Sequence, residues 1–401
     1  MRPTVVSVPV YLDHAATTPM RPEAVAAYVE AAAVVGNPSS IHSSGQNARR
    51  VLEEARESLA ESLGCSPIEV IFTSGGTEAI NLAIKGLFWA RNGRRILVPG
   101  GEHHATIDTV EWLQRHEGAA VDWLPLDPVG RVDISAASAA FVDGEPIALA
   151  TMLWANNEVG TLQPVTEVAA LAARAGVPLH VDAVAAFGHV PVDAAQVRRA
   201  SQSGAGTGLV ALSVSAHKIG GPVGVGALVL DRSAVLEPLL HGGGQQRQVR
   251  SGTQDVAAAV SFAAAARASV AELADEASRV RLLRERLVAG VRSAVPDVVV
   301  NGVDDASARL PGTAHFAFAG AQGDSLLFLL DAAGVAVSTG SACQAGIPEP
   351  SHVLLAMGRD EATARTALRV TLGRTTTDAD VDAFLAALPS AHAQARRAGL
   401  S

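Results

Sequence analysis

The sequence predicts an α/β protein with a mainly parallel sheet in a large first domain, and a smaller α+β domain towards the C-terminus. Up to about residue 255, short apolar runs of strand length alternate with segments of helical periodicity. That alternation is typical of successive strand–helix units. A long helical segment then interrupts it, and the order of elements changes. With 401 residues, 48% of them hydrophobic, the chain is long enough to build two cores.

The strand–helix units of the first part can be placed in order. Gly64 directly follows the first helical segment and predicts its end, because glycine adopts a left-handed backbone without strain. The predicted strands are 70–73, 95–98, 147–152, 178–181, 210–215 and 226–230. The predicted helices are 46–63, 77–91, 106–116 and 165–175.

The segment 256–295 is predicted to be helical throughout and to link the two domains, with a highly charged stretch at 272–286. We therefore expect a large domain at 14–260 and a small domain formed by 1–13 with 261–401. In the second part the predicted strands are 298–301, 315–318, 335–338 and 368–372, and the predicted helices are 324–333 and 378–388.

Composition excludes several classes of function. A formal charge of -9 argues against a broad nucleic-acid footprint. The most apolar long stretch, 256–274, carries Arg267 and Glu272 and indicates a buried helix instead of a membrane span. The N-terminal residues lack the pattern of a signal peptide, and two cysteines are too few for a disulfide framework. We expect a cytoplasmic protein with no direct nucleic-acid or membrane partner.

Lysine is nearly absent: only Lys85 and Lys218 occur among 31 Lys and Arg residues. Arginine stays protonated near neutral pH, whereas a desolvated lysine can act as a nucleophilic amine or form a Schiff base. Lys218 follows the apolar run 210–215, where an α/β protein places reactive groups. Lys85 lies in mid-helix opposite Ile84, Leu87 and Phe88 and is predicted to be a solvated lysine without a chemical role.

Two segments at predicted strand ends suit an anionic or cationic ligand group. Ser74-Gly75-Gly76-Thr77-Glu78 links a strand to a helix, so converging backbone N–H groups favour an anion, unless the segment is an ordinary turn. It lacks the GxxxxGK[ST] spacing of a nucleotide-binding P-loop. Asp182 ends another strand. Its carboxylate either caps a helix, forms a salt bridge, or neutralises a cationic nitrogen of a bound cofactor.

Two more strand ends carry polar groups. Asn156 and Asn157 form a turn or present an amide to a ligand. Glu102, His103 and His104 match no standard metal spacing, so no metal is predicted, and one imidazole can instead stack on a planar cofactor.

Cys343 lies in Ser338-Thr339-Gly340-Ser341-Ala342-Cys343-Gln344-Ala345-Gly346, among small residues. This composition predicts an exposed, mobile loop over about 338–348 with Cys343 as a candidate nucleophile. Cys65 follows a helix end and is predicted to be structural.

A reactive lysine, a phosphate cradle, a strand-end carboxylate and a stacking imidazole are the parts that pyridoxal 5′-phosphate requires, because it has an aldehyde, a phosphate and a basic ring nitrogen. Each pattern alone is weak. Their order and their shared position at strand ends make pyridoxal phosphate the predicted cofactor.

With these residues in place, the chain resembles the NifS/IscS-type cysteine desulfurases of the class V aminotransferase group, over nearly its whole length. The resemblance implies fold type I, a mainly parallel sheet of the seven-stranded type in the cofactor domain, and a homodimer. It is carried by Tyr11-Leu12-Asp13-His14-Ala15-Ala16-Thr17-Thr18-Pro19, Gly36-Asn37-Pro38-Ser39-Ser40, residues 73–78 and 156–160, His217-Lys218, Arg250-Ser251-Gly252-Thr253, Ser341-Ala342-Cys343 and residues 368–374.

Position by position, the resemblance implies that Lys218 forms the Schiff base with the cofactor and later removes the substrate Cα proton. Cys343 then takes the sulfur of L-cysteine as a persulfide, leaving alanine. Asp182 pairs with the ring nitrogen, Asn157 contacts the hydroxyl side and His103 stacks on the ring. The phosphate is held by Gly76, Thr77, Ser215, His217 and Thr253 of the partner subunit. Arg369 with Asn37 binds the substrate carboxylate.

The sequence differs from the family pattern at two positions expected to lie near Lys218. Ala185 stands where a glutamine usually lies near the ring oxygen, which predicts weaker cofactor retention, and Ala216 replaces a more usual glycine. Selenocysteine lyase or another class V enzyme is the alternative function, and a cofactor-binding scaffold for sulfur delivery is a further one. The sulfur acceptor is expected to be a protein, such as a scaffold for iron–sulfur cluster assembly or a thiolation enzyme.

Overall fold

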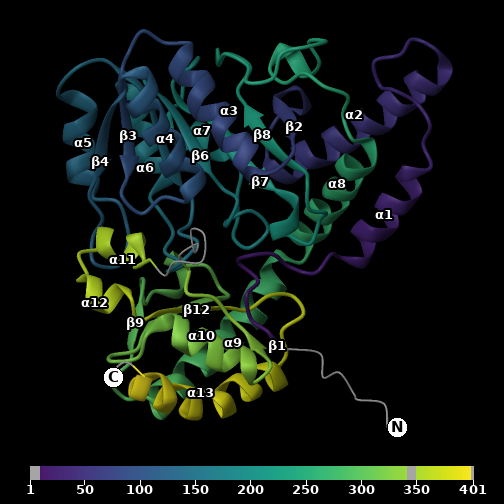
Figure 1. The fold of residues 1–401 in the computed structure, drawn as a ribbon. Helices are drawn as coiled ribbons and strands as arrows, with labels where there is room; N and C mark the ends of the chain where they lie inside the picture. The colour runs from purple at the N-terminus through teal and green to yellow at the C-terminus, as the bar shows by residue number, and fades with distance from the viewer. Residues whose placement is uncertain (1–9, 341–348, 399–401) are drawn as a thin grey trace.

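The computed structural model describes residues 10–340 and 349–398, and its larger part is built on a seven-stranded sheet (Figure 1). β8 runs antiparallel to β2 and β7, whereas all the other strands run in the same direction. The predicted mainly parallel sheet is therefore confirmed. In order across the sheet the strands are β2 (Val70–Thr73), β8 (Gly226–Leu230), β7 (Gly208–Ser215), β6 (Pro178–Asp182), β5 (Ile147–Leu153), β3 (Arg95–Pro99) and β4 (Ala120–Leu124).

Helices cover both faces of this sheet. The predicted stop at Gly64 is confirmed, since that residue ends α2 in the left-handed conformation at φ 62°. On one face lie α3 (Gly76–Trp89) and α4 (His104–Glu117). The other face carries α5 (Ile134–Val142), α6 (Val165–Arg174) and α7 (Ala194–Ser201), and beside β2, β8 and β7 it carries α1 (Pro22–Ala32), α2 (Ser43–Leu63) and α8 (Val256–Ala271).

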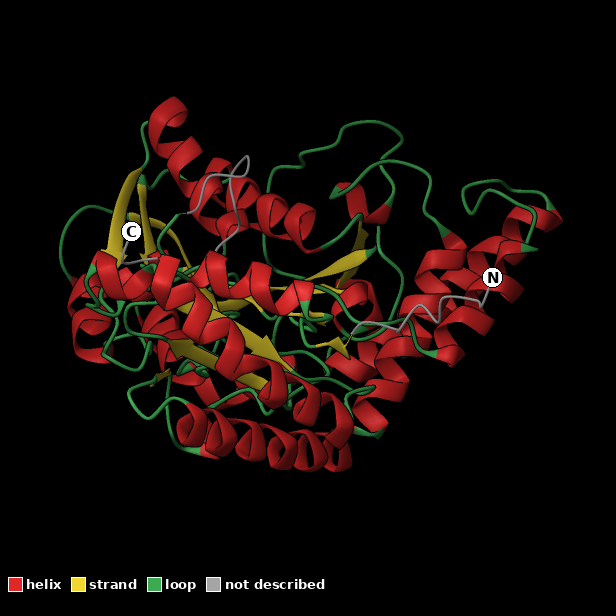
Figure 2. Ribbon diagram, turned by 60° about the horizontal axis from the view of Figure 1, so that its bottom comes forward, coloured by secondary structure: helices red, strands yellow, loops and turns green. Residues whose placement is uncertain are grey.

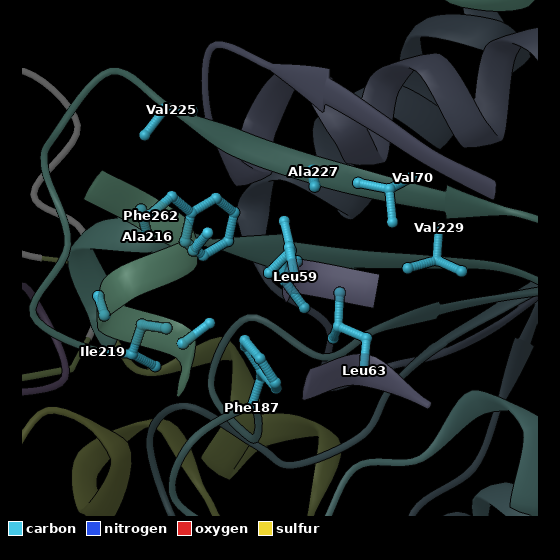
Figure 3. Packing of buried hydrophobic residues seen from close by; sticks show 14 of the residues in the cluster. Leu59, Leu63, Val70, Phe187, Ala216, Ile219, Val225, Ala227, Val229 and Phe262 are labelled. Carbon is cyan, nitrogen blue, oxygen red and sulfur yellow. The ribbon is translucent and has the colours of Figure 1, made fainter. Parts of the chain in front are cut away.

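The core under the end of β7 supports the loop that carries Lys218. Ala216 and Ile219, on either side of His217 and Lys218, are buried against Phe262 of α8 and Phe187 (Figure 3). Ala216 is fully buried, so the methyl group that departs from the family pattern is accommodated in this core. Packing on both sides fixes the backbone at Lys218, which lies in η2 (Ala216–Lys218).

The predicted continuous helix over 256–295 is instead two helices, α8 and α9 (Leu273–Ala294), which meet at a 70° bend. Residues of α8 as far as Ala266 pack with the large sheet, whereas Val280 of α9 packs with the small one. The predicted domain boundary at 260 therefore falls inside α8. Within the described ranges no single helix is long and apolar enough to cross a membrane, and this bent pair passes that test only with both helices counted together.

A three-stranded antiparallel sheet forms the smaller part, in the order β12 (Ala367–Thr371), β10 (Thr313–Ala317) and β9 (Val299–Asn301). Helices α9, α10 (Gly323–Ala332) and α13 (Asp378–Ala398) pack against it. Figure 2 shows helices lying outside the central strands of the molecule. β11 (Val335–Ala336), predicted as a longer strand, pairs with β1 (Val10–Tyr11). The short helices α11 (His352–Ala356) and α12 (Glu361–Ala364) complete this part.

Candidate active site

A cavity of about 480 Å³ is lined by the last residues of β5, β6 and β7 and, from the small sheet, by Arg369 and Thr371 of β12. This edge is where open α/β sheets bind ligands. The end of β7 supplies Ser215, the end of β6 supplies Asp182, and α3 supplies its first residues. Of the predicted site residues, Gly76, Thr77, His103, Asn157, Asp182, Ser215, His217, Lys218 and Arg369 line it together.

Lys218 reaches this cavity from η2, directly after β7. Its Nζ donates hydrogen bonds to the carbonyl oxygens of Ala15, at 2.5 Å, and Ala16, at 2.9 Å. Burial, and after it the charge of Arg369, lower the pKa of Lys218 to about 8, although Asp13 and Asp182 oppose the shift. A substantial fraction of the amine is therefore neutral near physiological pH, as a nucleophile or proton acceptor requires.

Asp182 ends β6 with its side chain 2% exposed. Its Oδ1 accepts a hydrogen bond from the backbone N–H of Val184 at 2.9 Å. Burial raises the pKa of Asp182 to about 6, so a cationic group placed against this carboxylate would be stabilised strongly. Behind it, His180 is held between the hydroxyls of Thr151 and Ser213 at 2.9 and 2.8 Å, and burial keeps it neutral with a pKa of about 3.

The start of α3, which the sequence predicts to bind an anion, lines the cavity with Gly76 and Thr77. Gly75 has a φ of 154°, and a Cβ at Gly76 would lie 2.8 Å from Cγ2 of Val184, so neither position suits a larger residue. Ser215 and His217 line the same cavity as Gly76 and Thr77. Backbone N–H groups of the first turn and these side chains can together bind a phosphate.

His103 caps α4, with its Nδ1 accepting a hydrogen bond from the N–H of Ala105 at 3.0 Å. The ring faces the cavity, but the surrounding protein lowers its pKa to about 4, first by burial and then through the charge of Lys218. A neutral imidazole held by its cap is suited to stacking on a planar ring.

Arg369 lies in the middle of β12 with its side chain buried. Its Nη1 donates to the carbonyl oxygen of Asn157 at 3.0 Å and its Nη2 to Oδ1 of Asp13 at 2.9 Å, while Nε has no partner among the residues that the structure describes. The guanidinium is thus oriented from both sides at the cavity wall. A carboxylate is the anion that this geometry suits best.

The family model of the aminotransferase class-V matches residues 10–384. The chain belongs to the class V aminotransferase family. A Mycobacterium tuberculosis protein named IscS-like cysteine desulfurase is 53% identical over 396 residues, covering 98% of each chain. Among solved structures, a NifS-like protein superposes with a TM-score of 0.85 at 33% identity, covering 95% of this chain and 98% of that one. A structure titled SspA in complex with cysteine gives 0.76 at 28% identity, covering 92% and 99%.

The residues of this class V family member fit pyridoxal phosphate. Asn157 lines the cavity, and within the described part of the chain its buried Oδ1 has no hydrogen-bond partner; a ligand donor would satisfy it. Lys218 offers an amine, Asp182 a buried carboxylate and the start of α3 a phosphate site. Among the described residues, no group of three His, Cys, Asp or Glu side chains is placed to hold a metal ion.

Three predicted site residues are not assembled here. Asn37 is exposed in the loop between α1 and α2, where its Oδ1 accepts from the N–H of Ser39 at 2.9 Å, and it does not line the cavity. Thr253 is exposed before α8 and likewise outside the cavity of its own chain, so its role across a dimer stays a prediction. Cys343 lies outside the described residues.

Further polar residues in or near the cavity were not predicted as site residues from the sequence. His189 contacts the Lys218 carbonyl oxygen through Nε2 at 3.1 Å, and His14, with a pKa lowered to about 4 by burial, also lines the cavity. Glu102 is fully buried behind His103, accepting from the N–H of Leu153 at 3.0 Å, and burial raises its pKa well above the ordinary range. The carbonyls of Ala15 and Ala16 carry no sequence signal, because every residue has such a group.

Cys65 and Lys85 both lie outside the cavity. Cys65 packs between two cores and burial raises the pKa of its thiol to about 12, as a structural cysteine requires. Lys85 is partly buried with its Nζ 4.1 Å from the ring centre of Trp112, so the expectation of a merely solvated lysine is corrected: it makes a cation–π contact.

Proposed function

We infer that this protein is a cysteine desulfurase. It converts L-cysteine and the thiol of Cys343 into L-alanine and a Cys343 persulfide. Atoms and electrons balance: the substrate carbon gains hydrogen in place of sulfur, and the sulfur is oxidised as it joins the thiol. The observation that carries this inference is the amine of Lys218, with its lowered pKa, in one cavity with Asp182 and Arg369. Its similarity to a named cysteine desulfurase supports the same function.

Pyridoxal phosphate, when bound, withdraws electrons from the substrate Cα. In our proposal Gly76, Thr77, Ser215 and His217 hold its phosphate, and Asp182 neutralises its ring nitrogen. The buried Oδ1 of Asn157 would accept a hydrogen bond on the hydroxyl side of the cofactor ring. His103 would stack on the face of that ring. Thr253 of the partner subunit adds a phosphate contact in a homodimer.

The protein groups then act in a fixed order. Arg369 holds the substrate carboxylate, with Asn37 as a further proposed ligand, and Lys218 accepts the Cα proton at Nζ. The Cys343 thiolate attacks the substrate sulfur, an S–S bond forms as the C–S bond breaks, and the electron pair of that bond stays with carbon. Carbon takes up protons and leaves as alanine.

The sulfur is then passed to an acceptor protein, for which we propose a scaffold of iron–sulfur cluster assembly or a thiolation enzyme. We place this work in the cytoplasm because a chain with only two cysteines suits a reducing compartment. Selenocysteine lyase is the alternative activity, since the same groups would act on the selenium analogue. The relative rates of alanine formation from cysteine and selenocysteine distinguish the two.

Replacement of Cys343 tests the proposed function directly. Cys343→Ala should abolish persulfide and sulfide formation from cysteine, because the attacking thiolate is missing, while pyridoxal phosphate remains bound at Lys218 with its visible absorbance unchanged. Cys65→Ala is the matched control and should retain activity. Persulfide is measured by mass spectrometry and alanine by chromatography. Undiminished sulfide release from Cys343→Ala would contradict the proposal.

A further inference from the structure

The segment 13–18, called the strap below, crosses the cavity from the small sheet to the loop of Lys218. At one end, the N–H of Thr371 donates to the carbonyl oxygen of Leu12 at 2.7 Å, and the N–H of Ala15 donates to Oγ1 of Thr371 at 2.9 Å. Asp13 there also accepts from Arg369. The strap is thus fastened to β12 at its first residues.

Its other end is fastened to the lysine loop. The N–H of Thr18 donates to the carbonyl oxygen of His217 at 3.2 Å. Just beyond the strap, the buried Arg21 donates through its N–H to Gly220 at 2.8 Å and through Nε to Ile219 at 3.1 Å. Because both ends are held, the carbonyls between them have fixed positions.

Those carbonyls belong to Ala15 and Ala16, and both accept hydrogen bonds from Nζ of Lys218. A neutral amine has two N–H groups and one lone pair. When both N–H groups point at the strap, tetrahedral geometry directs the lone pair away from it. An ammonium in the same place has one N–H left over, directed the same way.

We propose that the strap is the docking place of the Lys218 amine whenever that amine is not bonded to the cofactor, and that it aims the lone pair at the substrate Cα. Thr371 is the positioning residue: by accepting the hydrogen bond from the N–H of Ala15, it holds the strap in place. The role in turnover rests on the proposed function, but docking itself is a property of the cofactor-free chain.

Docking also stabilises the protonated amine. The charged or titratable groups around Nζ belong to several elements: Arg369 of β12, His103 of α4, His189, His217, Asp13 and Asp182. Arg369 and the histidines oppose the ammonium when charged, and the two carboxylates favour it. The two carbonyl dipoles add to the favourable side, so displacement of the strap should lower the pKa of the free amine.

The test uses cofactor-free protein and the rate at which pyridoxal phosphate condenses with Lys218, followed by visible absorbance across pH. Thr371→Val removes the acceptor for the Ala15 N–H, so we expect the apparent pKa of the amine to fall by about one unit, the size of one hydrogen bond to a charged group. Thr371→Ser keeps the hydroxyl and should restore the profile. Thr161→Val is the matched control, because Thr161 is equally buried, its Oγ1 accepts from the N–H of Val303, and it does not line the cavity.

A second readout follows exchange of the Cα proton of L-alanine in heavy water by cofactor-loaded protein. A misdirected lone pair should slow exchange by Thr371→Val about tenfold to a hundredfold with little change in alanine affinity. If its pH profile and exchange rate equal those of wild type and Thr161→Val, the strap proposal is overturned while the desulfurase function stands. If wild-type absorbance persists in Lys218→Ala, the proposed function itself fails. Should Thr371→Val not fold, failure of Thr371→Ser to keep the wild-type profile would equally count against docking.

Discussion

The two lysines of this chain share one chemistry and have opposite surroundings. Burial lowers the pKa of both. Lys85 lies on α3 over the ring of Trp112, a neutral partner that favours its charge. Lys218 lies at the end of β7 in the cavity, beside the cationic Arg369 and two fixed carbonyls. Burial alone therefore does not distinguish a reactive lysine from a structural one; the groups around the amine do.

The largest expected effect is the loss of Lys218. Lys218→Ala should remove the visible absorbance of bound pyridoxal phosphate and abolish alanine formation, because no other amine reaches the cavity among the described residues. Lys85→Ala should leave both unchanged. Absorbance spectra and alanine assays of the two variants check this, and a loss of cofactor binding in Lys85→Ala would break the comparison.

The same two positions should respond oppositely in stability. The cofactor-free protein keeps a charged Lys218 in a site that lowers its pKa from 10.5 to about 8, so Lys218→Met should raise the free energy of unfolding at pH 7. The gain is on the order of 1–3 kcal/mol after allowance for water in the cavity. Wild type regains this stability as pH rises from about 8 to 10.5, because its native amine releases its proton before the unfolded one.

Urea unfolding of wild type and Lys218→Met at pH 7 and at pH 10 measures this difference. The advantage of the variant should shrink at the higher pH. A variant that is less stable than wild type at pH 7 would show that the amine and its two carbonyl partners stabilise the fold, and that the site stores no strain.

Side-chain patterns in the sequence predicted the sheet and most of the cavity wall, because apolar strands end in polar residues at one edge. The strand at β4 was missed, since Asp122 and the exposed Trp123 interrupt its apolar pattern. The bend between α8 and α9 was missed because residues 270–275, where the two helices meet, contain no glycine or proline to mark a helix end. The carbonyls of Ala15 and Ala16 and the buried Glu102 were missed for a different reason: their roles depend on which distant segment faces them.

A smaller effect is expected where the family pattern is broken beside Lys218. Ala185 lines the cavity, and Ala185→Gln would supply the hydrogen bond to the cofactor that the family resemblance leads us to expect at this position. One such bond contributes about 1 kcal/mol, so the dissociation constant for pyridoxal phosphate should fall about fivefold. Equilibrium dialysis with Ala185→Ser as the control measures it, and an unchanged constant would mean that other groups already fill this place.

The smallest expected effect concerns Lys85. Lys85→Met keeps the length of the side chain but removes the cation over Trp112, so the free energy of unfolding should fall by about 0.5–1 kcal/mol, the value of a partly exposed cation–π contact. Lys85→Arg should retain most of it, because a guanidinium also stacks on the indole. Urea unfolding at pH 7 measures both variants against Lys218→Met. Both methionine variants could instead change the free energy of unfolding in the same direction. In that case the groups around each amine would not explain how the two lysines affect stability, and burial alone would account for both.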